Sequence, residues 1–167
     1  DEQKSLIDEN VNGIVNELKN AGVRVKYDNS DQARPGWKFA EYEMKGVPLR
    51  VAIGARDLEQ GVAELARRDT KEKRSVSMGV LVEVIQTELV AIQQQLLNRA
   101  RSFRDAHITP ADTWEEFENV LDSKTGFVAA HWDGTPETEE AIKEKTKATI
   151  RCIPLNNPAE KGACILT

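Results

Sequence analysis

The chain has 167 residues, a mass of 18.7 kDa, 40% apolar and 31% charged residues, and a net charge of −5. This length suits one large domain or two small ones with a hydrophobic core. No segment approaches the roughly 18–20 apolar residues of a membrane span, no signal peptide opens the chain, and its two cysteines make no disulfide framework. We therefore expect a globular, cytoplasmic protein without membrane contact.

Charge is distributed unevenly along the chain. Residues 34–74 carry ten basic and seven acidic side chains, whereas residues 108–167 carry six basic and eleven acidic ones. An acidic protein of this kind is not expected to bind nucleic acid non-specifically, but a local basic surface can hold RNA phosphates within a Debye length of ~8–10 Å. Charge alone leaves the simpler interpretation open, in which residues 34–74 form an ordinary solvated surface.

In the first half of the chain, apolar spacing and helix-breaking residues predict three helices and four strands. Apolar residues at helical spacing from Ile7 to Leu18 indicate a helix that Gly22 ends. The other predicted elements are a strand at 23–27, a polar loop at 28–33, a helix at 37–45 that follows Pro35 and stops at Gly46, strands at 47–53, 62–68 and 74–76, and a long helix at 78–105.

The second half, from about Ile108, predicts another alternation of strands and helices. The elements are a helix capped by Asp112 or Thr113 and ending at Leu121, a strand at 126–132 covered on both faces, a helix from Thr135-Pro136 to Lys145, and strands at 148–153 and 163–166 around a loop at 156–162. Strand–helix–strand connections of this length favour right-handed parallel crossovers. We therefore expect α/β folds in two domains, 1–77 and 108–167, joined by a long connecting helix at 78–107.

No motif in the chain predicts bond-making chemistry. The glycine-rich nucleotide loops, the zinc-protease helix and the serine-hydrolase elbow are all missing from the sequence. His107 and His131 have no ligand partners at metal-binding spacing, so both are expected to be structural. Cys152 lies in a predicted apolar strand and is expected to be a small buried thiol. The sequence therefore offers no catalytic residue.

Several short motifs nevertheless occur in a specific order. They are RPGWKFAEYE at 34–43, KGVP at 45–48, IGARD at 53–57, ARRDT at 66–70, RARSFR at 99–104, FVAAHW at 127–132 and ATIRCIP at 148–154. Together they resemble the C-terminal region of prolyl-tRNA synthetases of the archaeal and eukaryotic-like type. The resemblance implies a mixed-sheet anticodon-binding domain of the class IIa synthetases, followed by a small α/β domain with a zinc-binding-like site.

The resemblance also implies a set of RNA contacts. The family reads two guanines in the anticodon loop of proline tRNA, and its contact residues match Phe39, Glu43, Arg50, Asp57 and Lys73. The two carboxylates can accept hydrogen bonds from the N1–H and N2–H groups of guanine, and the two cations can donate to O6 and N7. An aromatic ring such as Phe39 can stack on a base of a single-stranded loop.

Three further basic residues of the same segment, Lys38, Arg67 and Arg68, are expected to contact the RNA backbone. This division explains why acidic residues occur within a basic segment: the carboxylates recognise bases, and the cations bind phosphate. The alternative assigns Phe39 to the hydrophobic core and makes Glu43 an ordinary charge on a helix surface. The residues alone favour that alternative, and the resemblance favours base reading.

The chain departs from the family at the zinc site of the C-terminal domain. Members often hold zinc through four cysteines, and the matching positions here are Asp133, Thr138, Cys164 and Thr167. One thiolate among four positions does not make a closed tetrahedral sulfur site. We therefore expect no zinc, with threonine and aspartate side chains bridging the loops that the metal would connect.

The resemblance implies a longer parent enzyme. In the family an upstream catalytic domain uses ATP and Mg²⁺ to attach proline to its tRNA, and the enzyme is usually a homodimer. We expect this chain to be a fragment that contacts that catalytic domain within one polypeptide, is inactive alone, and uses its acidic C-terminal part as a brace. The alternatives are the anticodon-binding domain of another class II synthetase, of the threonyl or glycyl type, or a stand-alone RNA-binding module.

Overall fold

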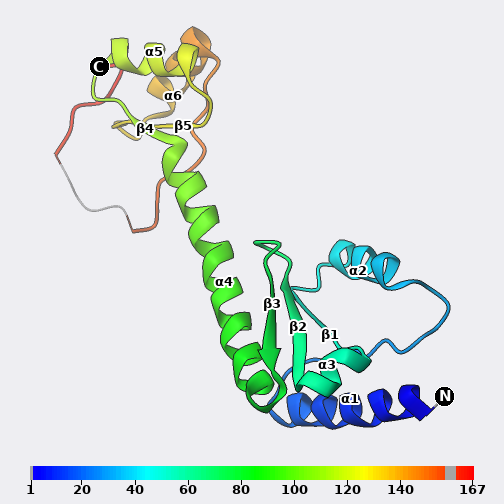
Figure 1. Cartoon of the computed structure of the whole chain (residues 1–167). Coiled ribbons are helices and arrows are strands. Elements are labelled where there is room, and N and C mark those ends of the chain that lie inside the picture. Colours follow the sequence, from blue (N-terminus) through cyan, green and yellow to red (C-terminus); the bar gives the residue numbers. More distant parts are fainter. Residues whose placement is uncertain (1, 157–160) are drawn as a thin grey trace. The chain divides into compact units, whose positions relative to one another are not determined.

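The chain folds into two compact units (Figure 1). The computed structural model describes residues 2–156 and 161–167. The division falls between Asn98 and Arg99, inside the long helix α4 (Leu81–Ala106), so each unit takes part of that helix. The domain ranges expected from the sequence stay a prediction. Within the described ranges, no helix is both long and apolar enough to cross a membrane.

The first unit is built on a three-stranded antiparallel sheet in the order β1-β2-β3. Its elements are α1 (Glu2–Asn20), α2 (Pro35–Met44), β1 (Leu49–Ala52), α3 (Ala55–Gln60), β2 (Val62–Arg67), β3 (Lys73–Ser77), the 3₁₀ turn η1 (Met78–Val80) and the first part of α4. The three helices and three of the four strands predicted for this half are thereby confirmed within a few residues.

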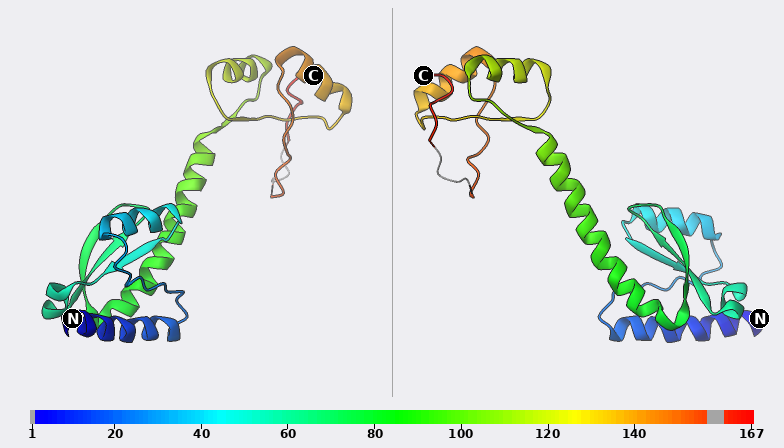
Figure 2. Two further views of the ribbon diagram at one scale, coloured as in Figure 1. Left: turned by 90° about the vertical axis from the view of Figure 1, so that its right-hand side faces the viewer. Right: turned by 60° about the vertical axis from the view of Figure 1, so that its left-hand side comes forward.

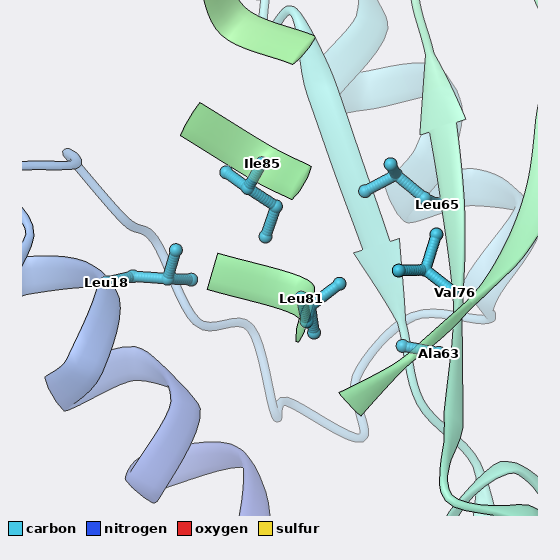
Figure 3. Close-up of a cluster of buried hydrophobic side chains, with 6 residues drawn as sticks. All are labelled: Leu18, Ala63, Leu65, Val76, Leu81 and Ile85. Atoms are coloured by element: carbon cyan, nitrogen blue, oxygen red, sulfur yellow. The ribbon is translucent and has the colours of Figure 1, made fainter. Parts of the chain in front are cut away.

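One face of this sheet forms the hydrophobic core of the first unit. Figure 3 shows Leu81 and Ile85 of α4 between Leu18 of α1 and the sheet. The sheet contributes Ala63 and Leu65 of β2, with Val76 of β3. Leu65 is only 2% exposed, so the alternating residues 63 and 65 fix which face of β2 is turned inward.

The opposite face of the sheet is more polar and is covered in part by α2. Helices α2 and α4 lie on opposite sides of the sheet (Figure 1, Figure 2). Arg50 pairs with Ala66, and Ala66 pairs with Lys73, so these three residues form one row across β1, β2 and β3. Because directly opposed residues of antiparallel strands share a face, this row lies on the side that faces α2.

Two features of the first unit differ from the predictions. The expected strand at 23–27 is wrong: its side chains alternate between half-buried and exposed, but its backbone forms no ladder with a neighbouring strand. Val23 and Val25 pack against the core without joining the sheet. Helix α3, between β1 and β2, was not predicted, and these two strands pair antiparallel.

The second unit contains a small parallel sheet. Its elements are the end of α4, β4 (Ile108–Pro110), α5 (Trp114–Ser123), β5 (Phe127–Ala129) and α6 (Pro136–Thr146). Strands β4 and β5 pair in parallel across α5. Strand β4 was not predicted, and the crossover expected across the helix at 135–145 does not form, because residues 148–153 are not a strand. The core consists of Ala111, Phe117, Ile142 and Ile165.

Local residues explain how the second unit begins and turns. Thr113 caps α5 by accepting a hydrogen bond from the N–H of Glu116, and Thr135 caps α6 in the same way. Gly126 adopts a φ of +128°, and a Cβ atom there would lie 2.3 Å from the carbonyl oxygen of His107. A side chain at this position would therefore collide with His107, the residue between α4 and β4.

Several predictions for the second unit are wrong. Residues 148–153 and 163–166 form no strands, and the observed strand within 126–132 is shorter than expected. Phe127 is 60% exposed, so β5 is not covered on both faces. Cys152 is exposed and not buried, because its segment does not join a sheet. The apolar composition of these segments was mistaken for core strands; the predicted loop at 156–162 lies largely outside the described residues.

Candidate nucleic-acid interface

A small hollow of about 20 Å³ lies where α2 meets the polar face of the first sheet. Two of its walls come from α2 and β1, and the third comes from the end of β2. Its lining residues are Phe39, Tyr42, Glu43, Val47, Arg50, Ala66, Arg67 and Arg68. Five of these eight residues were predicted from the sequence as base or phosphate contacts: Phe39, Glu43, Arg50, Arg67 and Arg68.

An arginine stacked on an aromatic ring lines the hollow. The guanidinium carbon of Arg50 lies 3.5 Å from the ring centroid of Phe39. One guanidinium nitrogen of Arg50 also donates a hydrogen bond to Glu64 at 3.2 Å. Stacking fixes the plane of the guanidinium group, and the ion pair fixes its rotation, so its remaining N–H groups have a defined direction.

Glu43 brings a carboxylate to the same hollow. Its partner is Lys71, whose ammonium lies 2.6 Å from the carboxylate. The hydrogen bond from Lys71 lowers the pKa of Glu43, and Arg50 and Arg68 lower it further through their charge. Glu43 is therefore an ionised hydrogen-bond acceptor at neutral pH, beside a fixed guanidinium donor.

Lys73 and Asp57 lie outside this hollow. Lys73 is exposed on β3 and belongs to the same row of the sheet as Arg50. Asp57 lies in the first turn of α3, where its carboxylate accepts a hydrogen bond from the N–H of Gly54 at 2.8 Å. This hydrogen bond gives Asp57 a structural role at the start of α3, and its contact with a base stays a prediction.

Two of the predicted phosphate-binding cations are engaged within the protein. Arg67 pairs with Asp69 and Glu88, each at 2.7 Å, and its side chain is only 15% exposed. Its register partner Leu49 packs against the core, so the Arg67 side chain lies on the core face, and the residue borders the hollow without presenting its guanidinium group to it. The hydrogen bonds that Arg67 donates to Asp69 are the main reason that the pKa of Arg67 is raised.

Lys38 is engaged in a different way, because it fastens the loop before α2. Its ammonium lies 2.8 Å from the carboxylate of Asp28 and also donates to the carbonyl oxygen of Ser30. Tyr42 donates a second hydrogen bond to Asp28 at 2.9 Å. Of the three predicted phosphate contacts, only Arg68 is exposed and has no ion pair within the described part of the chain.

The sequence did not point to two residues that hold charged side chains of the hollow in place. The sequence places Lys71 in a polar turn and gives it no partner. In the structure its backbone is left-handed, with a φ of 64°, and its ammonium donates a hydrogen bond to Glu43. Glu64 is a strand residue without any motif around it, yet it holds Arg50. The register of the sheet places Glu64 two residues from the partner of Arg50, and the sequence does not fix that register.

In the second unit, the four positions that match the family's zinc cysteines lie together. Thr138 donates a hydrogen bond to the carboxylate of Asp133, and the indole N–H of Trp132 donates to Thr138 at 2.9 Å. Burial raises the pKa of the Cys164 thiol, but backbone N–H groups and the Thr167 hydroxyl outweigh it and lower that pKa. One of these N–H groups belongs to Asp133, so the two loops are joined by hydrogen bonds.

The donor atoms at these positions do not suit zinc. Only Cys164 offers a thiolate, and both the Asp133 carboxylate and the Thr138 hydroxyl are used in hydrogen bonds. Over residues 2–156 and 161–167, no group of three or more histidine, cysteine or acidic side chains is placed to hold a metal ion. The geometry here is that of a hydrogen-bonded junction between loops.

Comparison with known proteins gives matches over both units. The sequence model described as "Anticodon binding domain" matches residues 2–88, and the one described as "Prolyl-tRNA synthetase, C-terminal" matches residues 114–167. Proline–tRNA ligase of Christiangramia forsetii is 52% identical over the whole chain, that of Cytophaga hutchinsonii 54% identical over 99% of it, and that of Porphyromonas gingivalis 50% identical over all of it. The chain spans 34% of the length of each of these relatives.

The mixed α/β fold and the first match define an anticodon-binding domain of the class II synthetase type. The relatives and the second match narrow this further: the chain belongs to the prolyl-tRNA synthetase family. The expectation drawn from the sequence motifs is confirmed at this level, and the threonyl and glycyl alternatives are not supported.

The adjacent residues Arg67 and Arg68 should separate stability from RNA binding. Arg67→Ala leaves the Asp69 and Glu88 carboxylates without their shared partner and should lower the free energy of unfolding by about 1–3 kcal/mol. Arg68→Ala should leave stability unchanged and weaken RNA binding equally for all sequences. Urea unfolding and RNA titration measure the two effects, and the reverse assignment would contradict this geometry.

Proposed function

We propose that the first unit reads the two guanines of the proline tRNA anticodon, one of them at the hollow between α2 and the sheet and the other on the neighbouring elements. The observation that carries the proposal is the stack of Arg50 on Phe39, next to the ionised carboxylate of Glu43. A fixed donor and a fixed acceptor side by side match the Watson–Crick and Hoogsteen edges of a guanine.

Each residue then has a defined part in recognition. Glu43 accepts hydrogen bonds from the N1–H and N2–H groups of a guanine, and Arg50 donates to O6 and N7. The main part of Phe39 is to fix the plane of the Arg50 guanidinium group, because that group already covers one face of the Phe39 ring. Lys73 and Asp57 serve the second guanine from the neighbouring elements, and Arg68 meets the RNA backbone.

The larger function follows from the relatives. We infer that the chain serves a cytoplasmic proline–tRNA ligase that joins proline to its tRNA with ATP and Mg²⁺, and that works as a homodimer. Catalysis then belongs to the part of the relatives that this chain does not span, and the chain is inactive by itself. Residues 108–167 of the second unit carry six basic and eleven acidic side chains, which favours a brace against the catalytic domain over contact with phosphate.

Glu43→Ala should abolish discrimination before it abolishes binding. The test compares the affinity of the chain for proline tRNA with that for a transcript in which both anticodon guanines are replaced. The wild type should prefer the first, and the variant should lose about 5- to 150-fold of that preference, because a base contact carries sequence information that a phosphate contact lacks.

Glu41→Ala is the matched control for this experiment. Glu41 lies on the same helix and also forms an ion pair with a lysine, Lys45, at 2.6 Å, but it does not line the hollow. This control should keep the wild-type preference. Equal affinity of the wild type for both RNAs would refute base reading by this chain.

We also propose that the second unit is held without zinc, by the hydrogen bonds around Asp133 and Thr138. A chelator should leave its melting temperature unchanged. Thr138→Val should lower the free energy of unfolding by about 1–3 kcal/mol, because Thr138 is buried and links Trp132 to Asp133. The exposed Thr149→Val is the control; one equivalent of bound zinc by elemental analysis would contradict the proposal.

A further inference from the structure

A second, more open hollow lies beside the start of α2. It is lined by the loop before the helix and by the first turns of the helix itself. Its lining residues are Asp28, Ser30, Gln32, Ala33, Arg34, Trp37 and Lys38. The indole of Trp37 is the largest apolar surface among them and is 61% exposed.

The walls of this hollow are fixed. Asp28 accepts hydrogen bonds from Lys38, Tyr42 and the N–H of Ser30. These hydrogen bonds lower the pKa of Asp28 to about 2, and the bond from Lys38 has the largest effect. The carboxylate therefore stays ionised at any ordinary pH. The loop is therefore held against α2, and Trp37 forms one wall of a preformed site.

The charge balance of the hollow favours an anionic ligand. Asp28 is neutralised by Lys38, and the neighbouring Asp31 is neutralised by Lys4. Arg34 is exposed and has no ion pair among the residues that the structure describes. One uncompensated guanidinium thus accompanies an exposed indole, which is the pairing that single-stranded RNA uses for its phosphate and its base.

The position of the hollow fits the same RNA strand that the first hollow would read. Trp37 and Phe39 are two residues apart on α2, which is about 3 Å along the helix axis. Their side chains leave the helix in different directions, because Phe39 meets the sheet whereas Trp37 faces outward. The two hollows adjoin through Tyr42, which lines the first and donates a hydrogen bond to Asp28 of the second, so neighbouring nucleotides of one RNA strand have both within their span.

We propose that Trp37 and Arg34 form a second nucleotide site, in which a base flanking the anticodon guanines stacks on the indole and its phosphate pairs with Arg34. This proposal rests on the proposed function of the first hollow. It assigns to Trp37 an affinity role without base identity, since every base offers a face for stacking.

The experiment measures the affinity of the chain for the anticodon stem-loop RNA of proline tRNA and for the same RNA with both guanines replaced. Trp37→Ala should weaken both affinities by the same factor, about 5- to 150-fold, whereas Trp37→Phe should retain most of the binding. Met44→Ala is the matched control. Met44 is 89% exposed on the same helix, lines neither hollow and should have no effect.

A spectroscopic readout keeps the test independent of folding. RNA should quench the tryptophan fluorescence of the wild type, and this quenching should be absent from Trp37→Phe, in which only Trp114 and Trp132 remain. Unchanged RNA affinity of Trp37→Ala would overturn the proposal and leave the indole as a surface for a protein. A loss confined to the guanine-containing RNA would also overturn it, because Trp37 would then read base identity. Neither result depends on Glu43, so a failure of the Trp37 proposal can be distinguished from a failure of guanine recognition by the first hollow.

Discussion

The stack of the Arg50 guanidinium on the Phe39 ring, at 3.5 Å, is the contact on which the site depends. It joins α2 to the sheet across a face that offers little apolar surface. The contact also gives the flexible Arg50 cation a defined direction as a hydrogen-bond donor, and the ion pair with Glu64 fixes the rotation of its guanidinium group. Without that contact, Glu43 and Arg50 would be separate surface charges on two elements.

The alternation of side chains in the first sheet puts the hydrophobic core on one face and the proposed RNA site on the other. Residues 63 and 65 of β2 are turned to the core, and so is Arg67, whose ion pairs tie the strand to α4. Ala66 is turned to α2, and its small side chain leaves room for the hollow. A shift of one residue in register would exchange these roles, so the hydrophobic core also determines which cation is available to RNA.

The sequence predicted the helices and most strands of the first unit because their apolar periods and glycine stops are strong. It failed at 23–27, 148–153 and 163–166, where an alternating or apolar pattern was present but no neighbouring strand completed a ladder. For the site, the motifs and the resemblance that they carry predicted Phe39, Glu43 and Arg50 as contacts of one RNA surface. Patterns could not show that Arg67 is engaged in the interior or that Lys71 reaches Glu43, because both depend on register and on a left-handed turn residue.

The most direct test of the central claim is an experimental structure of this chain bound to the anticodon stem-loop of proline tRNA. We predict one guanine in the hollow between α2 and the sheet, within hydrogen-bond distance of both Glu43 and Arg50, with Arg50 still lying on the Phe39 ring. A complex in which both guanines lie away from this hollow, with the Arg50–Glu43 surface unoccupied, would contradict the account.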